Sequence, residues 1–568
     1  MAKVAVERAA QKESGRERDW LEQLDPAFAS LHRNMSSLSE EGARLQMAAS
    51  HRRLFDLGLD LAHAAHERFG SEDDLDQFLR IAEYGRAILL KSRLNAFTSL
   101  RYAHVPDSVL AREQHLLKAL NVDPDDPKAG NEVFEHEEAY AAFLDTLRQR
   151  HPDYFALRYG DPSVTIRDLR SRLVTDQRDL LAYAVTGEHV YMLVISADTA
   201  ALLRAPRKSL SEAVSALNES VVARDIDRYL KAAHALHALI FAPVAPLLRR
   251  TELLIIPDGE LHRVNFEALL SAPATRSDFR EHLLIQRYAI AYLLSATTAI
   301  QFSDLKHGRP ATTLALAPGF SDDLKQRYIA QVMDSARIDR DYLSFVRQPF
   351  ARSTAQELGS LMSARVMVDG EADEPGFRTL AGEYGILHLG THAEMNEHAP
   401  MYSRLVLSKN GSSNAADADG YLHAYEIYEM QLRAQLAVLT ACETGAGSNV
   451  EGEGVRSLGY SFAYAGCPSL VTSLWEIDEK SSSEIITRFY EHLADGLPKH
   501  LALRQAKLDH LESAPDELAL PYYWAGMVLM GDVEPIEGAS GGRGIWMMIL
   551  AVLFSAVALW TIWRRMRR

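Results

Sequence analysis

A cysteine and a histidine each follow a short apolar run that ends in small residues. Residues 437–440 predict a buried strand, and Cys442 lies just beyond it in a loop that contains Gly445. Fifty residues upstream, a similar strand ends in a small-residue turn that carries His392. Because ligands bind at the carboxyl edge of open α/β sheets, we expect both side chains at that edge. A thiol beside an imidazole is what a cysteine nucleophile and its base require.

A buried structural role is the common alternative for a lone cysteine. The position of Cys442, after a strand and before a glycine-rich loop, favours a reactive group instead. A loop or helix N-terminus around Gly454 would lower its pKa. Cys467 lies at a predicted helix-to-strand corner and is interpreted as structural. The backbone N–H groups of Ala393 and Cys442 are predicted to aim at one oxyanion.

Two further histidines lie near His392. His388 falls inside the predicted strand, where we expect it to pack or to hydrogen-bond internally, and His398 follows in the next loop. A metal site is the alternative reading of this group. No accompanying cysteine or carboxylate pattern supports zinc, so we expect neither a metal nor another cofactor.

Asp478 and Glu479 follow the predicted strand Ser469–Leu474. One interpretation is that they are ordinary carboxylates in the first turn of a helix, where the helix dipole favours negative charge. The other places a carboxylate at the rim of a pocket that selects a basic substrate side chain. From the residues alone, both remain open.

Length, charge and cysteine content limit the class of protein. A chain of 568 residues is too long for one core, so we expect two or three domains. The net charge of −16 argues against nucleic acid as a partner. Two cysteines favour a reducing compartment, and the charged N-terminus, Met1 to Trp20, has no apolar core of a signal peptide.

The last apolar run, Gly544 to Trp563, has 20 residues and no charge. At about 1.5 Å per residue it would span roughly 30 Å, the hydrocarbon thickness of a bilayer. A buried core helix is the alternative, but the position between a linker (residues 533–543) and a basic tail (residues 564–568) favours a membrane anchor. The arginines of the tail would favour a cytoplasmic tail. The missing signal peptide favours a cytoplasmic catalytic domain, which we expect.

The first 150 residues predict helices. Leucine and alanine stripes at helical spacing, separated by a turn at residues 70–74, indicate a helical hairpin. A further helix is predicted for Glu135–Arg150, after a loop from Asn121 to Asn131. No clean 34-residue period is present, so the region is read as degenerate TPR-like repeats or a plain bundle.

Residues 151–300 predict an α/β region and residues 301–532 a second one. The first begins with a β-hairpin, Leu181–Val185 and His189–Ile195, and continues with mostly helical residues 200–248 and strands at 253–256 and 284–294. The second alternates strands and helices, which predicts a mainly parallel sheet covered on both faces. Its predicted strands are Leu314–Ala317, Arg365–Val368, Ile386–Leu389, Leu405–Leu407, Leu436–Thr440, Ser469–Leu474 and Ala525–Met530. Its predicted helices are Ala355–Met362, Gly454–Ala465, Ser482–Leu493 and Ala502–Leu511.

Several ordered blocks of the sequence resemble the CHAT-domain proteases, members of the caspase/separase group of cysteine peptidases. The resemblance covers residues 228–532, and the preceding part, about 10–227, resembles the helical and hairpin region that such proteins carry. The blocks are 253–262, 264–266, 288–297, 386–392, 439–445, 452–458, 465–471, 473–478 and 523–529.

The resemblance implies a caspase-like α/β fold with His392 as general acid/base and Cys442 as nucleophile. Comparison with separase implies that Asp478 or Glu479 lies near the pocket for the residue before the cut, with a basic preference. The family often has glycine after the histidine; here Ala393 retains the N–H on a less permissive backbone.

The expected function is a membrane-anchored cysteine endopeptidase that cleaves a protein substrate in bacterial signalling or defence. The helical half is expected to receive an activating protein partner or ligand. One alternative is a catalytically silent scaffold that binds a partner through its helices. Another is a thiol acyltransferase or amidase that uses the same two residues.

Overall fold

The computed structural model describes residues 16–37, 41–102, 106–120, 129–152, 154–155, 164–304, 311–332, 338–396, 398–409, 418–441, 444–445, 448–450 and 454–537. Cys442, Glu443 and the predicted membrane segment 544–563 therefore lie outside the described residues. Among the residues described, no helix combines the length and the apolar character needed to cross a bilayer.

The N-terminal region is helical, as predicted. Gly70 ends α4 with a φ of 65°, and the Ser71 hydroxyl accepts a hydrogen bond from the Asp73 N–H at the start of α5, so the predicted hairpin is confirmed. The second predicted stripe runs across two helices, because α5 ends at Tyr84 and α6 begins at Ile88. The helices are α2 (Glu17–Ser37), α3 (Glu41–Ser50), α4 (Arg52–Phe69), α5 (Glu72–Tyr84), α6 (Ile88–Tyr102), α7 (Asp107–Leu120) and α8 (Ala129–Arg150).

The middle region begins with the predicted hairpin, β1 and β2. Residues 200–206, predicted as helical, instead form β3, because their alternating burial suits a strand that adds to the edge of β2. The elements are α10 (Ile166–Arg172), β1 (Arg178–Val185), β2 (His189–Ile195), β3 (Ala200–Pro206), α11 (Leu210–Val222), α12 (Ile226–Ile240), β4 (Glu252–Ile256), α13 (Phe279–His282), β5 (Ala289–Tyr292) and α14 (Ala296–Asp304).

The C-terminal region alternates strands and helices, as predicted. Its first elements are β6 (Thr313–Pro318), α15 (Asp322–Gln331), α16 (Arg340–Ser344), α17 (Pro349–Leu361), β7 (Arg365–Asp369), α18 (Glu374–Leu380), β8 (Ile386–Gly390), β9 (Ala393–Glu394), β10 (Arg404–Val406) and β11 (Tyr421–His423). It continues with α19 (Ala424–Glu429), β12 (Leu436–Thr440), β13 (Ser448–Val450), β14 (Gly454–Arg456), α20 (Leu458–Tyr464), β15 (Ser469–Ser473), α21 (Glu479–Ala494), α22 (Lys499–Ser513), α23 (Pro521–Trp524) and β16 (Met527–Gly531).

One eleven-stranded sheet runs through both predicted α/β regions in the order β3-β2-β1-β4-β5-β16-β15-β12-β8-β6-β7. Most neighbouring strands are parallel; β16 runs antiparallel to β15, and the β1–β2–β3 ladder is also antiparallel. The late strand β16 joins the two halves, because it pairs with β15 on one side and with β5 on the other through Met530 and Tyr292.

Three predicted elements differ in detail. The predicted strand 284–294 begins as a 3-10 turn, Leu284–Gln286, and only Ala289–Tyr292 form β5. Residues 404–406 form β10 of a separate three-stranded sheet, β11-β10-β9, so their assignment to the main sheet is wrong. These short strands pair with each other because β8, the strand that precedes β9, is already paired with β12 on one side and β6 on the other. Residues 454–456 form β14 of a hairpin with β13, and the following helix begins only at Leu458.

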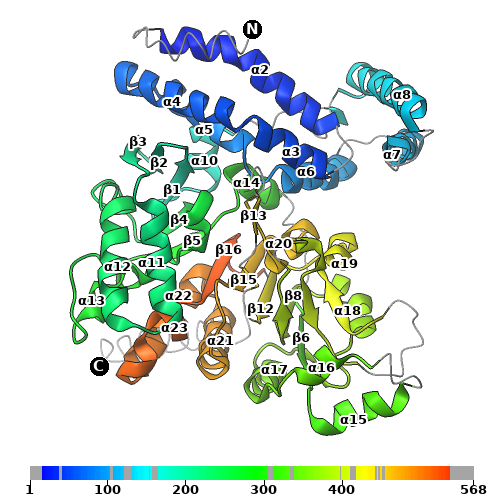
Figure 1. The fold of residues 1–568 in the computed structure, drawn as a ribbon, viewed down its shortest axis with the longest axis vertical. Coiled ribbons are helices and arrows are strands. Elements are labelled where there is room, and N and C mark those ends of the chain that lie inside the picture. Colours follow the sequence, from blue (N-terminus) through cyan, green and yellow to red (C-terminus); the bar gives the residue numbers. More distant parts are fainter. Residues whose placement is uncertain are drawn as a thin grey trace, which may run out of the picture.

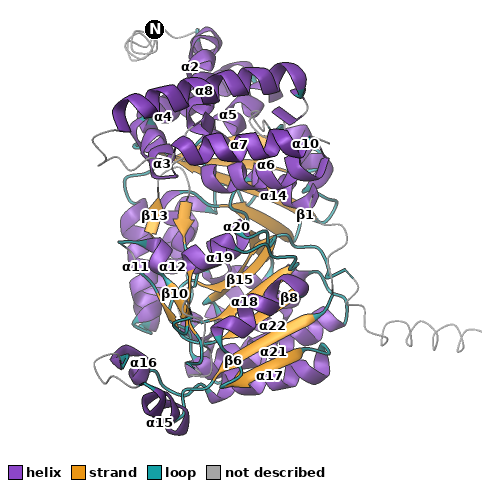
Figure 2. Ribbon diagram, turned by 90° about the vertical axis from the view of Figure 1, so that its right-hand side faces the viewer, coloured by secondary structure: helices purple, strands orange, loops and turns teal. Residues whose placement is uncertain are grey.

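Alternate residues of the central strands face two different helical layers. In β12, Leu436 and Val438 join the core on one face, while Ala437 and Leu439 join the core on the other. Helices α17, α21 and α22 pack on the first face and lie side by side (Figure 2). Helices α18, α19 and α20 cover the second face, together with α6 from the N-terminal helices stacked across the end of the molecule (Figure 1).

Candidate active site

The strands that precede His392 and Cys442 are direct neighbours in the sheet. β8 and β12 are parallel, and their last paired residues are Gly390 and Thr440. His392 and Cys442 each follow two residues later, so the two positions continue neighbouring strands by the same length. Gly390 permits this close approach, because a Cβ there would lie 3.1 Å from the Ala351 Cβ and 3.2 Å from the Thr440 hydroxyl.

The imidazole of His392 is half-buried between two aromatic rings. Its ring centroid lies 5.0 Å from that of Phe320 and 5.1 Å from that of Phe345. Its Nε2 lies 2.8 Å from the carbonyl oxygen of Val346. A carbonyl only accepts hydrogen bonds, so Nε2 carries the proton and Nδ1 keeps a lone pair in the neutral ring.

Burial lowers the pKa of His392 below its ordinary value, while the Val346 carbonyl acts in the opposite direction. Burial prevails because the apolar rings of Phe320 and Phe345 disfavour the charged imidazolium. At neutral pH the ring is therefore neutral and held in one orientation.

The segment that touches His392 is itself held by two lysines. Lys325 donates from Nζ to the carbonyl oxygens of Leu343 and Phe345, each at 2.7 Å. Lys409 forms an ion pair of 2.6 Å with Asp339, which caps α16 just ahead of this segment. These contacts place Phe345 and Val346 against the histidine.

Ala393, the residue after the histidine, begins β9. The Val406 N–H donates to the His392 carbonyl oxygen at 2.9 Å, which makes the next pair, Ala393 and Leu405, a pair without mutual hydrogen bonds. The Ala393 N–H therefore points away from β10 and toward the open side of the strand.

The residues on both sides of position 442 are held by Ser473 at the end of β15. Its hydroxyl donates to the Ala441 carbonyl at 2.6 Å and accepts from the Thr444 N–H at 3.1 Å. The Gly459 N–H of α20 donates to the Thr444 carbonyl at 2.9 Å. The loop that carries the cysteine is thus anchored to β15 and to α20.

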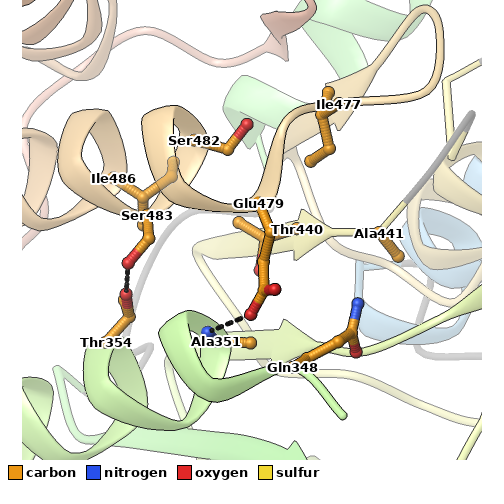
Figure 3. Close-up of a pocket in the computed structure, with 10 residues that line it drawn as sticks. All are labelled: Gln348, Ala351, Thr354, Thr440, Ala441, Ile477, Glu479, Ser482, Ser483 and Ile486. Carbon is orange, nitrogen blue, oxygen red and sulfur yellow. Dashed lines mark hydrogen bonds between the residues drawn. The ribbon is translucent and has the colours of Figure 1, made fainter. Parts of the chain in front are cut away.

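A small cavity of about 30 Å³ lies beside Ala441 on the face covered by α17 and α21 (Figure 3). Its lining residues come from three segments of the chain, 348–354, 440–441 and 477–486. They are Gln348, Ala351, Thr354, Thr440, Ala441, Ile477, Glu479, Ser482, Ser483 and Ile486. Figure 3 shows the Glu479 carboxylate directed at Ala351 and the Gln348 amide directed toward Ala441.

The two adjacent carboxylates have different surroundings. Asp478 caps α21 and accepts from the Ser481 N–H at 2.9 Å. Its contacts are those of an ordinary carboxylate at the start of a helix. Glu479 lines the cavity, and its Oε1 accepts from the N–H groups of Phe350 (2.8 Å) and Ala351 (3.1 Å) at the start of α17. Burial raises the pKa of Glu479, while those two N–H groups act in the opposite direction.

The remaining predicted residues lie apart from this arrangement. His388 is fully buried within β8, with Nδ1 3.4 Å from the Tyr490 hydroxyl, and burial lowers its pKa to about 4. His398 is exposed on the turn after β9. Cys467 is buried, and its thiol donates to the Ser469 carbonyl at 3.3 Å, which confirms that it is structural.

The contributors to the site that sequence reasoning missed include Phe345, Val346, Gln348 and Ser473, as well as Phe320. The first three lie in an irregular stretch more than 40 residues before His392, and Val346 acts through its backbone carbonyl, which any residue type supplies. Ser473 begins one of the blocks that resemble the CHAT family, 473–478, and lies near the end of the predicted strand Ser469–Leu474. That position was the one feature of the sequence that could have indicated its role.

The fold and this edge define an α/β protein with a mainly parallel sheet and a polar site at its carboxyl end. The model of the CHAT domain family matches residues 230–532, more than half of the chain. The chain belongs to the CHAT domain family. The match begins within two residues of the predicted start.

Solved structures match the chain at low identity. The separase–securin complex of Saccharomyces cerevisiae is 8% identical with a TM-score of 0.40, and the match covers 91% of this chain and 48% of separase. The Arg-specific cysteine proteinase gingipain R is 9% identical with a TM-score of 0.31, and the match covers 50% of this chain and 64% of that protein. The matches thus span less than two thirds of either relative. No curated protein matches the sequence.

Proposed function

We propose that the protein is a cysteine endopeptidase in which Cys442 is the nucleophile and His392 the general acid/base. The observation that carries this proposal is the parallel pairing of β8 with β12, which brings the two positions to equal distances beyond paired residues. Membership of the CHAT family supports it.

The surroundings of His392 suit the proposed chemistry. Because Val346 holds the Nε2 proton, Nδ1 is the atom that takes the thiol proton as the sulfur attacks the substrate carbonyl carbon. The N–H groups of Ala393 and Cys442 stabilise the resulting oxyanion. When the C–N bond breaks, the imidazolium returns the proton to the leaving amine, and water then hydrolyses the thioester with the same base.

A polypeptide is the substrate that the surface suits best. Among the described residues, two large apolar side chains near the site are exposed: Val346 has an exposed fraction of 67% and Phe350 of 40%. Val346 contacts His392 through its carbonyl, and Phe350 contacts Glu479 through its N–H. Exposed apolar side chains beside a polar site are typical of a surface that binds another chain. Glu479 in the cavity is the carboxylate for a basic side chain before the cut, and Asp478 supports it by capping α21.

Alkylation by an activity probe tests the proposal. We expect an acyloxymethyl ketone peptide probe to label the protein at Cys442, as located by mass spectrometry of the adduct. Labelling should vanish in Cys442→Ala and fall at least about a hundredfold in His392→Ala, the loss typical of removing a general base. Absence of labelling of the intact protein, with and without candidate partners, would favour the silent scaffold. Labelling without cleavage of any peptide bond would favour the acyltransferase or amidase.

We also infer that the helical region controls the site. The support is that α6 shares a core with α20 through Leu90 and Leu94, and α20 holds Thr444, two residues after Cys442 in the sequence. An activating partner that binds the helices would act along this contact. The test compares the rate at which the probe labels residues 154–537 alone, the same residues with the helices added as a separate chain, and the full chain. Equal rates in all three would contradict control of the site by the helical region.

Membrane attachment through residues 544–563, with the catalytic region in the cytoplasm, is part of the same proposal and rests on the sequence. A chain ending at residue 537 should move from the membrane fraction to the supernatant on centrifugation. Labelling of a cysteine added to the tail only from the cytoplasmic side would contradict the orientation.

A further inference from the structure

Lys325 of α15 carries a positive charge that no carboxylate of the described residues neutralises. Its Nζ donates to the carbonyl oxygens of Leu343 and Phe345, each at 2.7 Å, the short distance of a charge-assisted hydrogen bond. The next cation along that segment, Arg347, pairs with Asp322 at 3.2 Å. Lys325 therefore differs from its neighbour in keeping its charge while it binds only neutral acceptors.

We propose that Lys325 is a positioning residue of the candidate active site: it holds the segment that orients His392, and its charge keeps the imidazole neutral. This inference rests on the proposed role of His392 as the base and names the residue that prepares the ring for that role. The ammonium group acts on the histidine and its neighbours rather than on a substrate.

The ammonium group holds the backbone at two points next to the histidine. α16 ends at Ser344, and the last carbonyls of a helix have no partner within the helix. An ammonium group has three N–H donors, so one lysine can serve the carbonyls of both Leu343 and Phe345. With these held, the Phe345 ring packs on His392, and the next residue, Val346, offers its carbonyl to Nε2.

The start of α15 brings the lysine to this place together with one of the rings. Phe320, whose ring centroid lies 5.0 Å from that of His392, precedes Ser321, the N-cap of α15. The Lys325 N–H donates to the Ser321 carbonyl at 3.0 Å, which closes the first turn of the helix. Figures 1 and 2 both show α15 beside α16. One short connection thus supplies an apolar ring and a cation to the same imidazole.

Two charged side chains act on His392 in opposite directions. Burial is the main cause that lowers the pKa of His392, and the charge of Lys325 acts in the same direction, whereas the Val346 carbonyl and Glu394 of β9 raise it. Glu394 is paired with Arg404 of β10 at 2.7 Å, so its negative charge is largely balanced. The charge of Lys325 has no such counterpart, so it disfavours a second positive charge on the imidazole.

The test uses the full-length protein with Cys442→Ala, so that the state of His392 is measured apart from the proposed reaction. Isotope-labelled histidine reports the charge of each ring by NMR, and His392→Gln identifies the signal. In Lys325→Met, which keeps the side-chain length but removes the cation and its donors, the titration of His392 should move to higher pH. Hydrogen–deuterium exchange in peptides that cover residues 343–346 should become about tenfold faster, as for the loss of a hydrogen bond to a charged group.

Arg327→Met is the matched control, because Arg327 is exposed on the same helix and its loss changes the net charge by the same amount. It should leave both the titration and the exchange as in the parent, and Lys325→Arg should restore both. Melting temperatures establish that each variant is folded. If Lys325→Met does not fold, Glu394→Gln gives a second measurement of the charge effect, since removal of the opposing carboxylate should move the titration of His392 to lower pH.

The two parts of the proposal fail separately. Equal titrations of His392 in Lys325→Met and Arg327→Met, or an unchanged titration in Glu394→Gln, would overturn the role of charge. Unchanged exchange at residues 343–346 in Lys325→Met would overturn the holding role. None of these outcomes depends on alkylation of Cys442, which tests the peptidase itself.

Discussion

At the scale of single residues, the site depends on how the protein treats the charge of its histidines. In the proposed mechanism His392 accepts a proton, yet two phenylalanine rings pack against it. The rings keep it neutral and available, and the Val346 carbonyl fixes which nitrogen is free. Orientation and neutrality thus come from different neighbours and can be altered separately.

Replacing Phe345 by alanine should expose the imidazole and raise its pKa toward the ordinary value. Because burial lowers the pKa of His392, the rate of Cys442 alkylation in the parent protein should stay high below pH 6.5 and fall only at lower pH. In Phe345→Ala the acidic limb should move to higher pH. Phe350→Ala, an exposed phenylalanine in the same segment, serves as the control and should leave the profile unchanged. An identical acidic limb in both variants would show that the ring does not tune the base.

His388 makes a different prediction, about stability. Burial lowers its pKa to about 4, whereas the unfolded chain binds a proton near pH 6.5. The unfolded state therefore takes up more protons between these values, and stability is lost as pH falls from about 6.5 toward 4. His388→Gln should reduce the loss between pH 7 and pH 5 by about 2 kcal/mol. Urea unfolding at both pH values measures this, and an unchanged difference would contradict it.

At the scale of elements, a buried carboxylate of the helical region contacts the start of α14. Glu83, at the end of α5, accepts from the N–H groups of Ala296 (3.1 Å) and Thr297 (2.9 Å) at the start of α14. It also faces Lys91 at 3.5 Å and Arg86 at 3.7 Å. Burial opposes the charge of Glu83, but these cations and donors together lower its pKa, so the carboxylate stays ionised.

Glu83→Ala should destabilise the protein by about 3–5 kcal/mol, because it removes a buried carboxylate that faces two buried cations and accepts two backbone N–H groups. The control is Glu72→Ala on the same helix, since Glu72 pairs with Arg170 at a half-exposed site and should contribute no more than about 1 kcal/mol. Thermal unfolding followed by circular dichroism gives both values. Equal shifts in melting temperature would mean that Glu83 does not tie the helices to the sheet.

At the scale of the whole molecule, the sheet joins the first and last parts of the chain. β16 lies between β5 and β15, and α22 packs against β5. A buried ion pair between Lys507 and Glu267 crosses the same boundary. The two α/β regions predicted from sequence therefore share one sheet and one core on the face of α22.

Cutting the chain between residues 304 and 311 should leave two parts that do not fold cooperatively alone. Each part would expose a strand edge and the apolar residues that the other part covers. Expressed together, the two parts should copurify and melt in one transition, as measured by scanning calorimetry against the uncut chain. A separate cooperative transition for residues 311–568 alone would contradict this.

Much of the fold was readable from local pattern. Strand–helix alternation identified the mainly parallel sheet, because buried parallel strands form continuous apolar runs. The predictions were wrong at residues 200–206, which form an edge strand, and at residues 404–406, which belong to a separate small sheet. Whether such strands form depends on which neighbouring strand is free to pair. Local sequence carries little of that information.

For the site, sequence alone singled out His392 and Cys442, because each lies in a compact motif after an apolar strand. It also marked Asp478 and Glu479 without deciding between capping and pocket. Only the tertiary structure separated those two, by packing the start of α17 against Glu479. It likewise brought Val346 and Gln348 to the site from far along the chain. Val346 acts through its backbone carbonyl, which any residue type supplies, and Gln348 reaches the cavity because the start of α17 packs there.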